Sequence, residues 1–187
     1  MSDCARCLPP IAASDARILI LGSMPGRASL AARQYYAHPR NAFWPIMGRL
    51  LGFDVAQDYM TRVKALSSAG VAVWDVLDFC HRPGSLDSAI DEKSLVVNDL
   101  AGFLAAHRAI RRVFFNGGAA ARLFDRHLGA ILNLGGLQLT RLPSTSPAHA
   151  ALTFAQKLAA WQVVAVDPSF QANFSEVPSN SPGHRSP

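Results

Sequence analysis

Apolar and polar positions along this chain form a pattern of short buried strands separated by helices. Four apolar runs have the length and composition of buried strands, at 17–21, 71–76, 113–115 and 137–142. Helical spacing of apolar residues, with glycines as stop signals, predicts helices at 42–51, 56–69 and 93–107, from 118 to near 129, and at 150–166. Strands that alternate with helices predict an α/β fold in which helices cover both faces of a parallel sheet.

The two ends of the chain differ in composition from this alternating region. Residues 1–14 include Pro9 and Pro10, which disfavour regular structure, and they predict a loosely docked leader. Residues 167–187 contain four prolines and five serines with little apolar content, a composition typical of a disordered tail. We therefore expect one folded domain over residues 15–166.

Each predicted strand ends in polar or glycine-rich residues. The first leads into a turn at 22–26, the second ends at Asp75, the third ends at Asn116, and the polar run 144–146 follows the fourth. In a parallel sheet these ends meet at one edge, where ligands bind. The sequence therefore predicts a binding site at that edge.

The loop after the first strand is rich in aromatic and cationic side chains. It holds two tyrosines and three arginines, namely Tyr35, Tyr36, Arg27, Arg33 and Arg40. Aromatic faces and cations together suit a flat, anionic or nucleotide-like ligand. A rigid loop whose aromatic rings fill the edge of the core is the structural alternative.

Charge and hydropathy narrow the class of partner. The formal net charge of +5 and the sequence pI of about 9.6 are compatible with a polyanionic partner. No apolar run approaches the ~20 residues of a membrane span, and residues 1–10 lack the apolar core of a signal peptide. These features predict a cytoplasmic protein that does not act at a membrane.

The three cysteines do not predict a disulfide framework, because their number is odd. Cys4 and Cys7 have the spacing of metal ligands, and Cys80 with His81 could complete a set of four. Two thiols in the leader and one core cysteine are the simpler interpretation, and we expect no metal.

Several well-known catalytic signatures are missing from the sequence. The turn at 22–26 is not followed by the Gly-Lys-Ser/Thr of a phosphate-binding loop, and it lacks GxGxxG spacing. No G-x-S-x-G motif surrounds Ser144, which argues against a serine hydrolase. The run 144–146 suits either a helix-capping turn or a phosphate clamp, and Asp75 either caps a turn or faces a pocket.

Four segments in the order GSMPGRASL, QYYAHPRNAFW, FFNG and LPSTSPAHA resemble the uracil-DNA glycosylase superfamily. The resemblance is greater to its hypoxanthine-DNA glycosylase branch, the DNA-deoxyinosine glycosylases, and spans roughly residues 15–165. It implies a three-layer α/β/α sandwich with a central four-stranded, mainly parallel sheet, in a monomer that flips a deaminated base out of double-stranded DNA. The implied activity is monofunctional hydrolysis of the N-glycosidic bond in base excision repair, with hypoxanthine as the base and no cofactor or metal. A uracil or mispair glycosylase and a catalytically weak damaged-DNA binding module are the alternatives.

The resemblance also implies roles for individual residues. The implied catalytic residues are Asn41, Asn116 and Ser144. The implied base-binding residues are Gly22, Met24, Tyr36 and Asp75. The implied DNA-binding residues are Arg27, Arg40, Ser144, Thr145, Ser146 and His149.

Three positions depart from the family's pattern. Met24 stands where relatives carry an Asp or Asn that activates water, and a thioether cannot polarise water. We expect that role to move to Asn41, the nearest amide on the same loop. Ser144 stands where relatives carry His or Asn, and His149 stands where the branch carries Asn. No lysine lies in these loops, so a Schiff-base lyase step is not expected.

Overall fold

The four predicted strands form one parallel sheet. They are β2 (Ile18–Gly22), β3 (Val71–Asp75), β6 (Arg112–Asn116) and β7 (Gln138–Leu142). In the computed structural model, which describes residues 4–129 and 136–165, the strand order is β3-β2-β6-β7 and all three pairings are parallel. The predicted α/β/α fold with a four-stranded parallel sheet is therefore confirmed, while the predicted tail at 167–187 lies outside the described residues.

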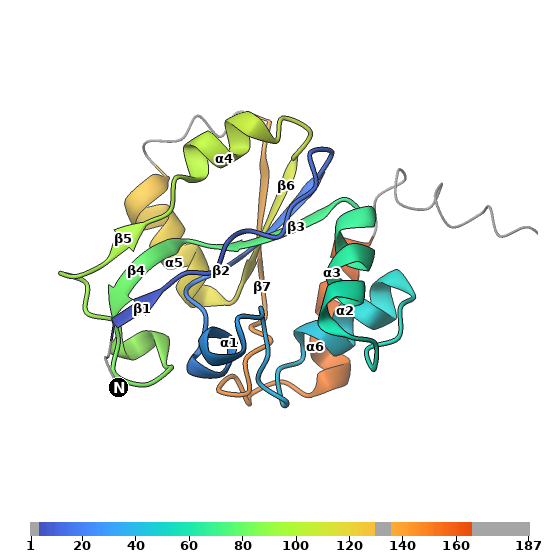
Figure 1. The fold of residues 1–187 in the computed structure, drawn as a ribbon, viewed down its shortest axis with the longest axis horizontal. Coiled ribbons are helices and arrows are strands. Elements are labelled where there is room, and N and C mark those ends of the chain that lie inside the picture. Colours follow the sequence, from blue (N-terminus) through green and yellow to red (C-terminus); the bar gives the residue numbers. More distant parts are fainter. Residues whose placement is uncertain (1–3, 130–135, 166–187) are drawn as a thin grey trace, which may run out of the picture.

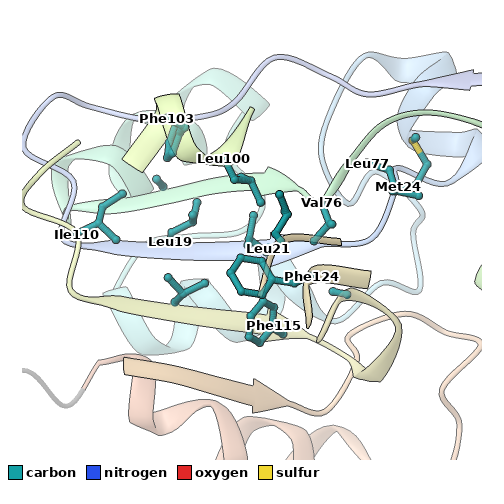
Figure 2. Packing of buried hydrophobic residues seen from close by; sticks show 14 of the residues in the cluster. Leu19, Leu21, Met24, Val76, Leu77, Leu100, Phe103, Ile110, Phe115 and Phe124 are labelled. Atoms are coloured by element: carbon teal, nitrogen blue, oxygen red, sulfur yellow. The ribbon is translucent and has the colours of Figure 1, made fainter. Parts of the chain in front are cut away.

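Successive side chains of the central strands point to opposite faces of the sheet. Leu19 and Leu21 of β2 pack in one hydrophobic cluster with Phe115 and Phe124, which Figure 2 shows from close by. Ile18 and Ile20 of the same strand pack in the other cluster. Because both faces are apolar, the strands appear in the sequence as continuous apolar runs.

Helices cover the two faces of the sheet, as Figure 1 shows. The first cluster lies under α4 (Leu100–Ala106) and α5 (Gly118–Leu128). The second cluster lies under α2 (Phe43–Leu51), α3 (Tyr59–Ser68) and α6 (Phe154–Trp161). Fully buried leucines, isoleucines and phenylalanines in these clusters each contribute about 1.5–3 kcal/mol from removing apolar area from water.

Capping residues set the limits of the helices and correct three predicted starts. The side chain of Asp58 accepts a hydrogen bond from the Thr61 N–H, so α3 begins at Tyr59 and not at 56. Gly52 ends α2 with a φ of 72°, as its glycine stop signal predicts. The side chain of Asp99 accepts a hydrogen bond from the Gly102 N–H, so α4 begins at Leu100 and not at 93. Thr153 forms a capping box with Gln156, so α6 begins at Phe154 and not at 150.

A second, antiparallel sheet was not predicted. It contains β1 (Cys4–Arg6), β4 (Leu77–His81) and β5 (Val96–Val97), in the order β1-β4-β5. The prediction of no regular structure in the leader was wrong for β1, and the prediction of a loop after Asp75 was wrong for β4. These strands have little apolar periodicity, and their hydrogen-bond partners lie more than 70 residues away for β1, so no local pattern marks them.

The remaining elements are short. Helix α1 (Arg27–Ala32) lies inside the predicted polar loop, and two 3-10 turns occupy Asp87–Ala89 and Gln162–Val164. Over residues 4–129 and 136–165, no helix has the length and apolar character that crossing a membrane requires.

Candidate active site

The carboxyl ends of the parallel strands surround a pocket of about 480 Å³, a size that suits a small organic ligand. Its lining comes from residues 22–29, most of 35–41, Asp75, 85–87, Asn116 and 144–148. Strand register brings these groups together, since Gly22 pairs with Asp75 between β2 and β3. The predicted convergence of the strand ends at one site is therefore confirmed.

Asp75 provides a buried carboxyl group to the pocket. Its side chain is only 3% exposed, and burial raises its pKa to about 7, although the Cys7 thiol counteracts the rise by donating to Oδ2 across 3.6 Å. No hydrogen-bond donor among the described residues reaches Oδ1. That oxygen is therefore available to a ligand in the pocket.

Gly22 makes room for this carboxylate. A Cβ built on Gly22 would lie 2.2 Å from Asp75 Oδ1 and 3.5 Å from the Tyr36 hydroxyl oxygen. Any larger residue at this position would displace the carboxylate, because real Cβ atoms do not approach an oxygen so closely. The structure thus indicates a steric role for Gly22 beside Asp75.

Tyr36 and Tyr35 have different surroundings although they are adjacent. Tyr36 has a φ of 55° and stacks on Phe43, with ring centroids 3.9 Å apart, so one face of its ring is supported from behind. Its buried hydroxyl has no hydrogen-bond partner among the described residues, and burial raises its pKa. Tyr35 is instead a core residue, 3% exposed, whose hydroxyl donates to the Leu8 carbonyl.

Met24 faces the core with its side chain and the pocket lining with its backbone. The side chain is 6% exposed and belongs to the same cluster as Leu77, at the end of that cluster in Figure 2. Its carbonyl accepts a hydrogen bond from Arg82 at 3.5 Å, and its N–H has no acceptor among the described residues. This packing explains why an apolar residue is accommodated at this position.

Asn41 lines the pocket directly before Ala42, the N-cap residue of α2, and its side chain binds the first N–H of that helix. Its Oδ1 accepts a hydrogen bond from the Phe43 N–H at 3.0 Å, and its own N–H donates to the His38 carbonyl at 2.8 Å. The side-chain Nδ2 has no acceptor in the described part of the chain. In this arrangement Asn41 Nδ2 can donate a hydrogen bond to a ligand in the pocket, while Oδ1 already accepts one from the Phe43 N–H.

Asn116 and Thr145 bind each other through two hydrogen bonds. Asn116 Nδ2 donates to Thr145 Oγ1 at 2.9 Å, and the Thr145 N–H donates to Asn116 Oδ1 at 2.8 Å. The Thr145 carbonyl accepts from the Ala42 N–H, and the Thr145 residue is 0% exposed. Thr145 therefore connects its own loop with the end of β6 at Asn116 and with the start of α2 at Ala42. It has no exposed surface for the phosphate contact that we expected of it.

The Ser144–Ser146 segment forms consecutive turns closed by its own hydroxyls. Ser144 Oγ accepts from the Ser146 N–H, and Ser146 Oγ accepts from the Ala148 N–H, both at 3.2 Å. The Lys157 side chain, 6% exposed, holds this loop by donating to the carbonyls of Ser146 and His149. His149 itself does not line the pocket, so the site contains the other predicted residues but not this one.

A third wall of the pocket was missed by the sequence analysis. It consists of Ser85, Leu86 and Asp87, in the turn after β4. The guanidinium of Arg82, only 2% exposed, fixes this turn to the first pocket loop by donating to the Pro25 carbonyl at 2.5 Å. The sequence signal was limited to turn-forming residues, which do not show what a turn packs against.

Of the three arginines in the first loop, Arg27 and Arg40 line the pocket and Arg33 does not. Both lining arginines are exposed. Cations at the mouth of a pocket attract anionic groups of a ligand.

The described residues contain no group of three or more His, Cys, Asp or Glu side chains placed to hold a metal ion. Cys4 lies opposite His81 between β1 and β4, whereas Cys7 is directed to Asp75. The two thiols of the Cys4-x2-Cys7 spacing therefore have separate surroundings.

Comparison with known proteins adds independent information. The family model described as the uracil DNA glycosylase superfamily matches residues 9–165. The chain is 33% identical over 146 residues to a protein named hypoxanthine DNA glycosylase from Methanosarcina acetivorans, which covers 77% of this chain and 87% of the relative. It is 35% identical over 114 residues to a protein of the same name from Methanosarcina barkeri, which covers 58% of this chain and 68% of the relative. The solution NMR structure of a candidate uracil DNA glycosylase from Methanosarcina acetivorans has a TM-score of 0.71 and 28% identity, and covers 86% of this chain and 98% of its own.

Proposed function

The chain belongs to the uracil DNA glycosylase superfamily, and on this premise we propose that it is a monofunctional glycosylase that hydrolyses the N-glycosidic bond of hypoxanthine in double-stranded DNA. The observation that carries the proposal is the pocket at the strand ends, with the buried Asp75 carboxyl group at its wall and a free Oδ1. The proposal treats the protein as a cytoplasmic monomer that needs no cofactor.

Asp75 would recognise the edge of the flipped base. Hypoxanthine, xanthine and uracil each carry a ring N–H beside a carbonyl, whereas adenine and cytosine carry a bare ring nitrogen at that position. An ionised carboxylate accepts a hydrogen bond from the ring N–H and repels the lone pair of a bare ring nitrogen. In its ionised form, which becomes the main form only as pH rises above its pKa of about 7, Asp75 therefore favours deaminated bases over adenine and cytosine.

Tyr36 would hold the flipped base by stacking. Phe43 supports one face of the Tyr36 ring, and Tyr36 also belongs to the pocket lining. Stacking of a base on an aromatic ring contributes about 1–3 kcal/mol. A ring that is fixed in advance loses little conformational entropy when the base arrives.

The chemical step breaks the bond between C1′ of deoxyribose and N9 of the base. Charge develops on the sugar as an oxocarbenium ion and on the base as an anion, water adds to C1′, and its proton is released. Asn41 Nδ2 can donate a hydrogen bond to the departing base or orient the water. The side-chain amide of Asn116 forms two hydrogen bonds with Thr145, so Asn116 would position the walls of the pocket and not take part in the reaction.

Single-turnover assays test this assignment on duplexes that contain one deoxyinosine, deoxyuridine or deoxyxanthosine. We expect release of hypoxanthine, and Asn41→Ala should lower its rate by about 10²–10³, the usual cost of losing one preorganised polar contact. Binding to a duplex with an abasic-site analogue should be nearly unchanged.

Asn41→Asp is the matched control for the capping role. Aspartate keeps the oxygen that accepts the Phe43 N–H but removes the amide donor. A donor role predicts that Asn41→Asp is folded and slow, while a capping role alone predicts wild-type rates. Release of uracil in preference to hypoxanthine would favour the uracil or mispair glycosylase, and tight abasic-site binding without release of any base would favour the damaged-DNA binding module.

A further inference from the structure

Cys7 contacts the Asp75 carboxyl group without lining the pocket. Its Sγ donates to Asp75 Oδ2 at 3.6 Å, whereas Asp75 Oδ1 lies beside Gly22 of the pocket lining. This is the one hydrogen bond to the carboxyl oxygens that the described part of the chain shows. The thiol therefore occupies one carboxyl oxygen and leaves the other to a ligand.

Backbone contacts fix the place of Cys7. It directly follows β1, and its N–H donates to the Asp78 carbonyl at 2.6 Å. Strand β1 pairs with β4, which begins just after Asp75. Further along the chain, Ile11 forms a bridge with Val73, which precedes Asp75 on β3. The segment that carries Cys7 is thus held to the chain both before and after Asp75.

The thiol has one proton to donate and lies near more than one acceptor. The Leu8 carbonyl lies 3.1 Å from Cys7 Sγ, but it already accepts a hydrogen bond from the Tyr35 hydroxyl at 3.0 Å. Because an ionised carboxylate is a stronger acceptor than a carbonyl, the proton goes to Asp75 once that group is ionised. Burial, and then the charge of Asp75, raise the pKa of the Cys7 thiol to about 12, so the thiol keeps its proton while Asp75 titrates.

We propose that Cys7 is a positioning residue that holds the Asp75 carboxyl group with Oδ1 towards the pocket and stabilises its ionised form. A hydrogen bond to the charged form of a carboxyl group favours that form. The ionised form accepts the ring N–H of a deaminated base, so Cys7 extends base recognition to lower pH. This inference rests on the proposed function for its substrate.

Other titratable side chains also interact with Asp75, namely Tyr35, Tyr36, Arg82 and Asp87. The charge of Asp87 raises the pKa of Asp75, and the charge of Arg82 lowers it. Burial raises the pKa of both tyrosines, so they are neutral where Asp75 titrates. A substitution at Cys7 removes none of these groups, so their effects are common to the wild type and its variants.

The first test is the pH profile of Cys7→Val, since valine fills the space of the thiol without offering a donor. The rate constant for base release at subsaturating protein concentration reports the ionisation of the free protein. The midpoint of this profile should rise by about one pH unit in the variant. Release from a deoxyinosine duplex should then be slower by about tenfold at pH 6 and by less than about twofold at pH 8.5.

Two further variants separate positioning from a structural role. Cys7→Ser retains a donor, so its midpoint should lie nearer to that of the wild type than to that of Cys7→Val. Cys4→Val is the matched control, because Cys4 is exposed on β1 and pairs with His81, and it should leave the profile unchanged. A loss by the same factor at every pH in Cys7→Val, or a wild-type profile, would overturn the proposal. If valine unfolds the protein, Cys7→Ala removes the same donor and should shift the midpoint in the same direction.

NMR titration of the Asp75 carboxyl carbon in protein with isotope-labelled aspartate tests Cys7 without catalysis. The signal is identified by its absence from Asp75→Asn, and its midpoint should rise by about one pH unit in Cys7→Val. If the wild type released no base but this midpoint rose, the proposed function would fail and the positioning role would stand. If release occurred and neither midpoint moved, the positioning role alone would fail.

Discussion

The two sheets of this protein differ in what surrounds their strands. All five residues of β2 are buried, and β3 and β6 are buried along most of their length between two helical layers. In the small sheet, β1 has one buried residue between two exposed ones, and the two residues of β5 are not buried. The three adjacent strands β3, β2 and β6 therefore bury most of their residues, whereas the edge strand β7 is largely exposed and the small sheet adds Ala5, Leu77 and Cys80 to the first cluster.

The pocket uses both sheets for different purposes. The parallel sheet provides Gly22, Asp75 and Asn116 from its strand ends, which are fixed by strand register. The small sheet provides the wall at 85–87, which is fixed by a few side-chain hydrogen bonds. The pocket lining thus combines walls that are fixed by strand register with one wall that is fixed by side-chain hydrogen bonds.

A matched pair of phenylalanine substitutions tests where the stability lies. Phe114 on β6 is 1% exposed between the sheet and its helices, while Phe79 on β4 is half-buried. Phe114→Ala should lower the free energy of unfolding by about 3–5 kcal/mol through lost burial and a cavity. Phe79→Ala should lower the free energy of unfolding clearly less. Equal decreases for the two variants in urea unfolding would show that both sheets contribute equally to stability.

Asp75 makes the stability of the parallel sheet depend on pH. Its pKa of about 7 in the folded state lies above the ordinary value of 3.8, so the folded protein retains a proton that the unfolded chain has released. The contribution of this group to stability is therefore highest near pH 4 and falls as pH rises towards 7, above which it stays low. The total decrease is up to about 4 kcal/mol.

Asp75→Asn removes this titration and provides the measurement. In thermal unfolding of both proteins from pH 4 to pH 8, the melting temperature of the variant should rise relative to that of the wild type as pH increases. Parallel stability curves would contradict a buried carboxyl group with a raised pKa. The raised pKa of Asp87, which burial causes, is common to both proteins and does not create the difference.

Substitution of Arg82 and of Arg6 compares how much a buried and an exposed arginine near the small sheet contribute to stability. Arg82 is buried and donates to two backbone carbonyls, so Arg82→Met should cost about 1–3 kcal/mol of stability by leaving those carbonyls unpaired. It should also slow base release, because the wall at 85–87 would no longer be fixed. Arg6 forms an exposed ion pair with Asp78, and Arg6→Met should change stability by less than about 1 kcal/mol. Similar losses for both variants in chemical unfolding would show that burial does not decide the contribution of these arginines.

The smallest expected effect concerns the arginines at the pocket mouth. If Arg40 meets a phosphate, Arg40→Gln should lower the slope of log K against log salt concentration by about one, because one fewer counterion is released. Arg49, an exposed arginine of α2 outside the pocket lining, is the control, and Arg49→Gln should leave the slope unchanged. An unchanged slope for Arg40→Gln in DNA titrations would remove Arg40 from the DNA interface.

The sequence alone determined the parallel sheet, most of the helices and the edge of the sheet that carries the pocket. A strand buried on both faces must be apolar throughout, as 18–21 and 113–115 are, so its position can be recognised locally. Parallel connections then place Asp75, Asn116 and the 144–146 run at one edge, and all of them line the pocket.

The individual contacts were decided only by the tertiary structure. The side chain of Met24 packs in the core, and the side chain of Asn116 forms a hydrogen bond with Thr145. Leu86 lines the pocket from a turn that is held by hydrogen bonds from Arg27 and Ser23. These partners lie 29 to 64 residues apart in sequence for the hydrogen bonds concerned. Local patterns encode which face of an element avoids water, but they do not encode which distant polar group will satisfy a given donor or acceptor, and that choice fixed the roles within this pocket.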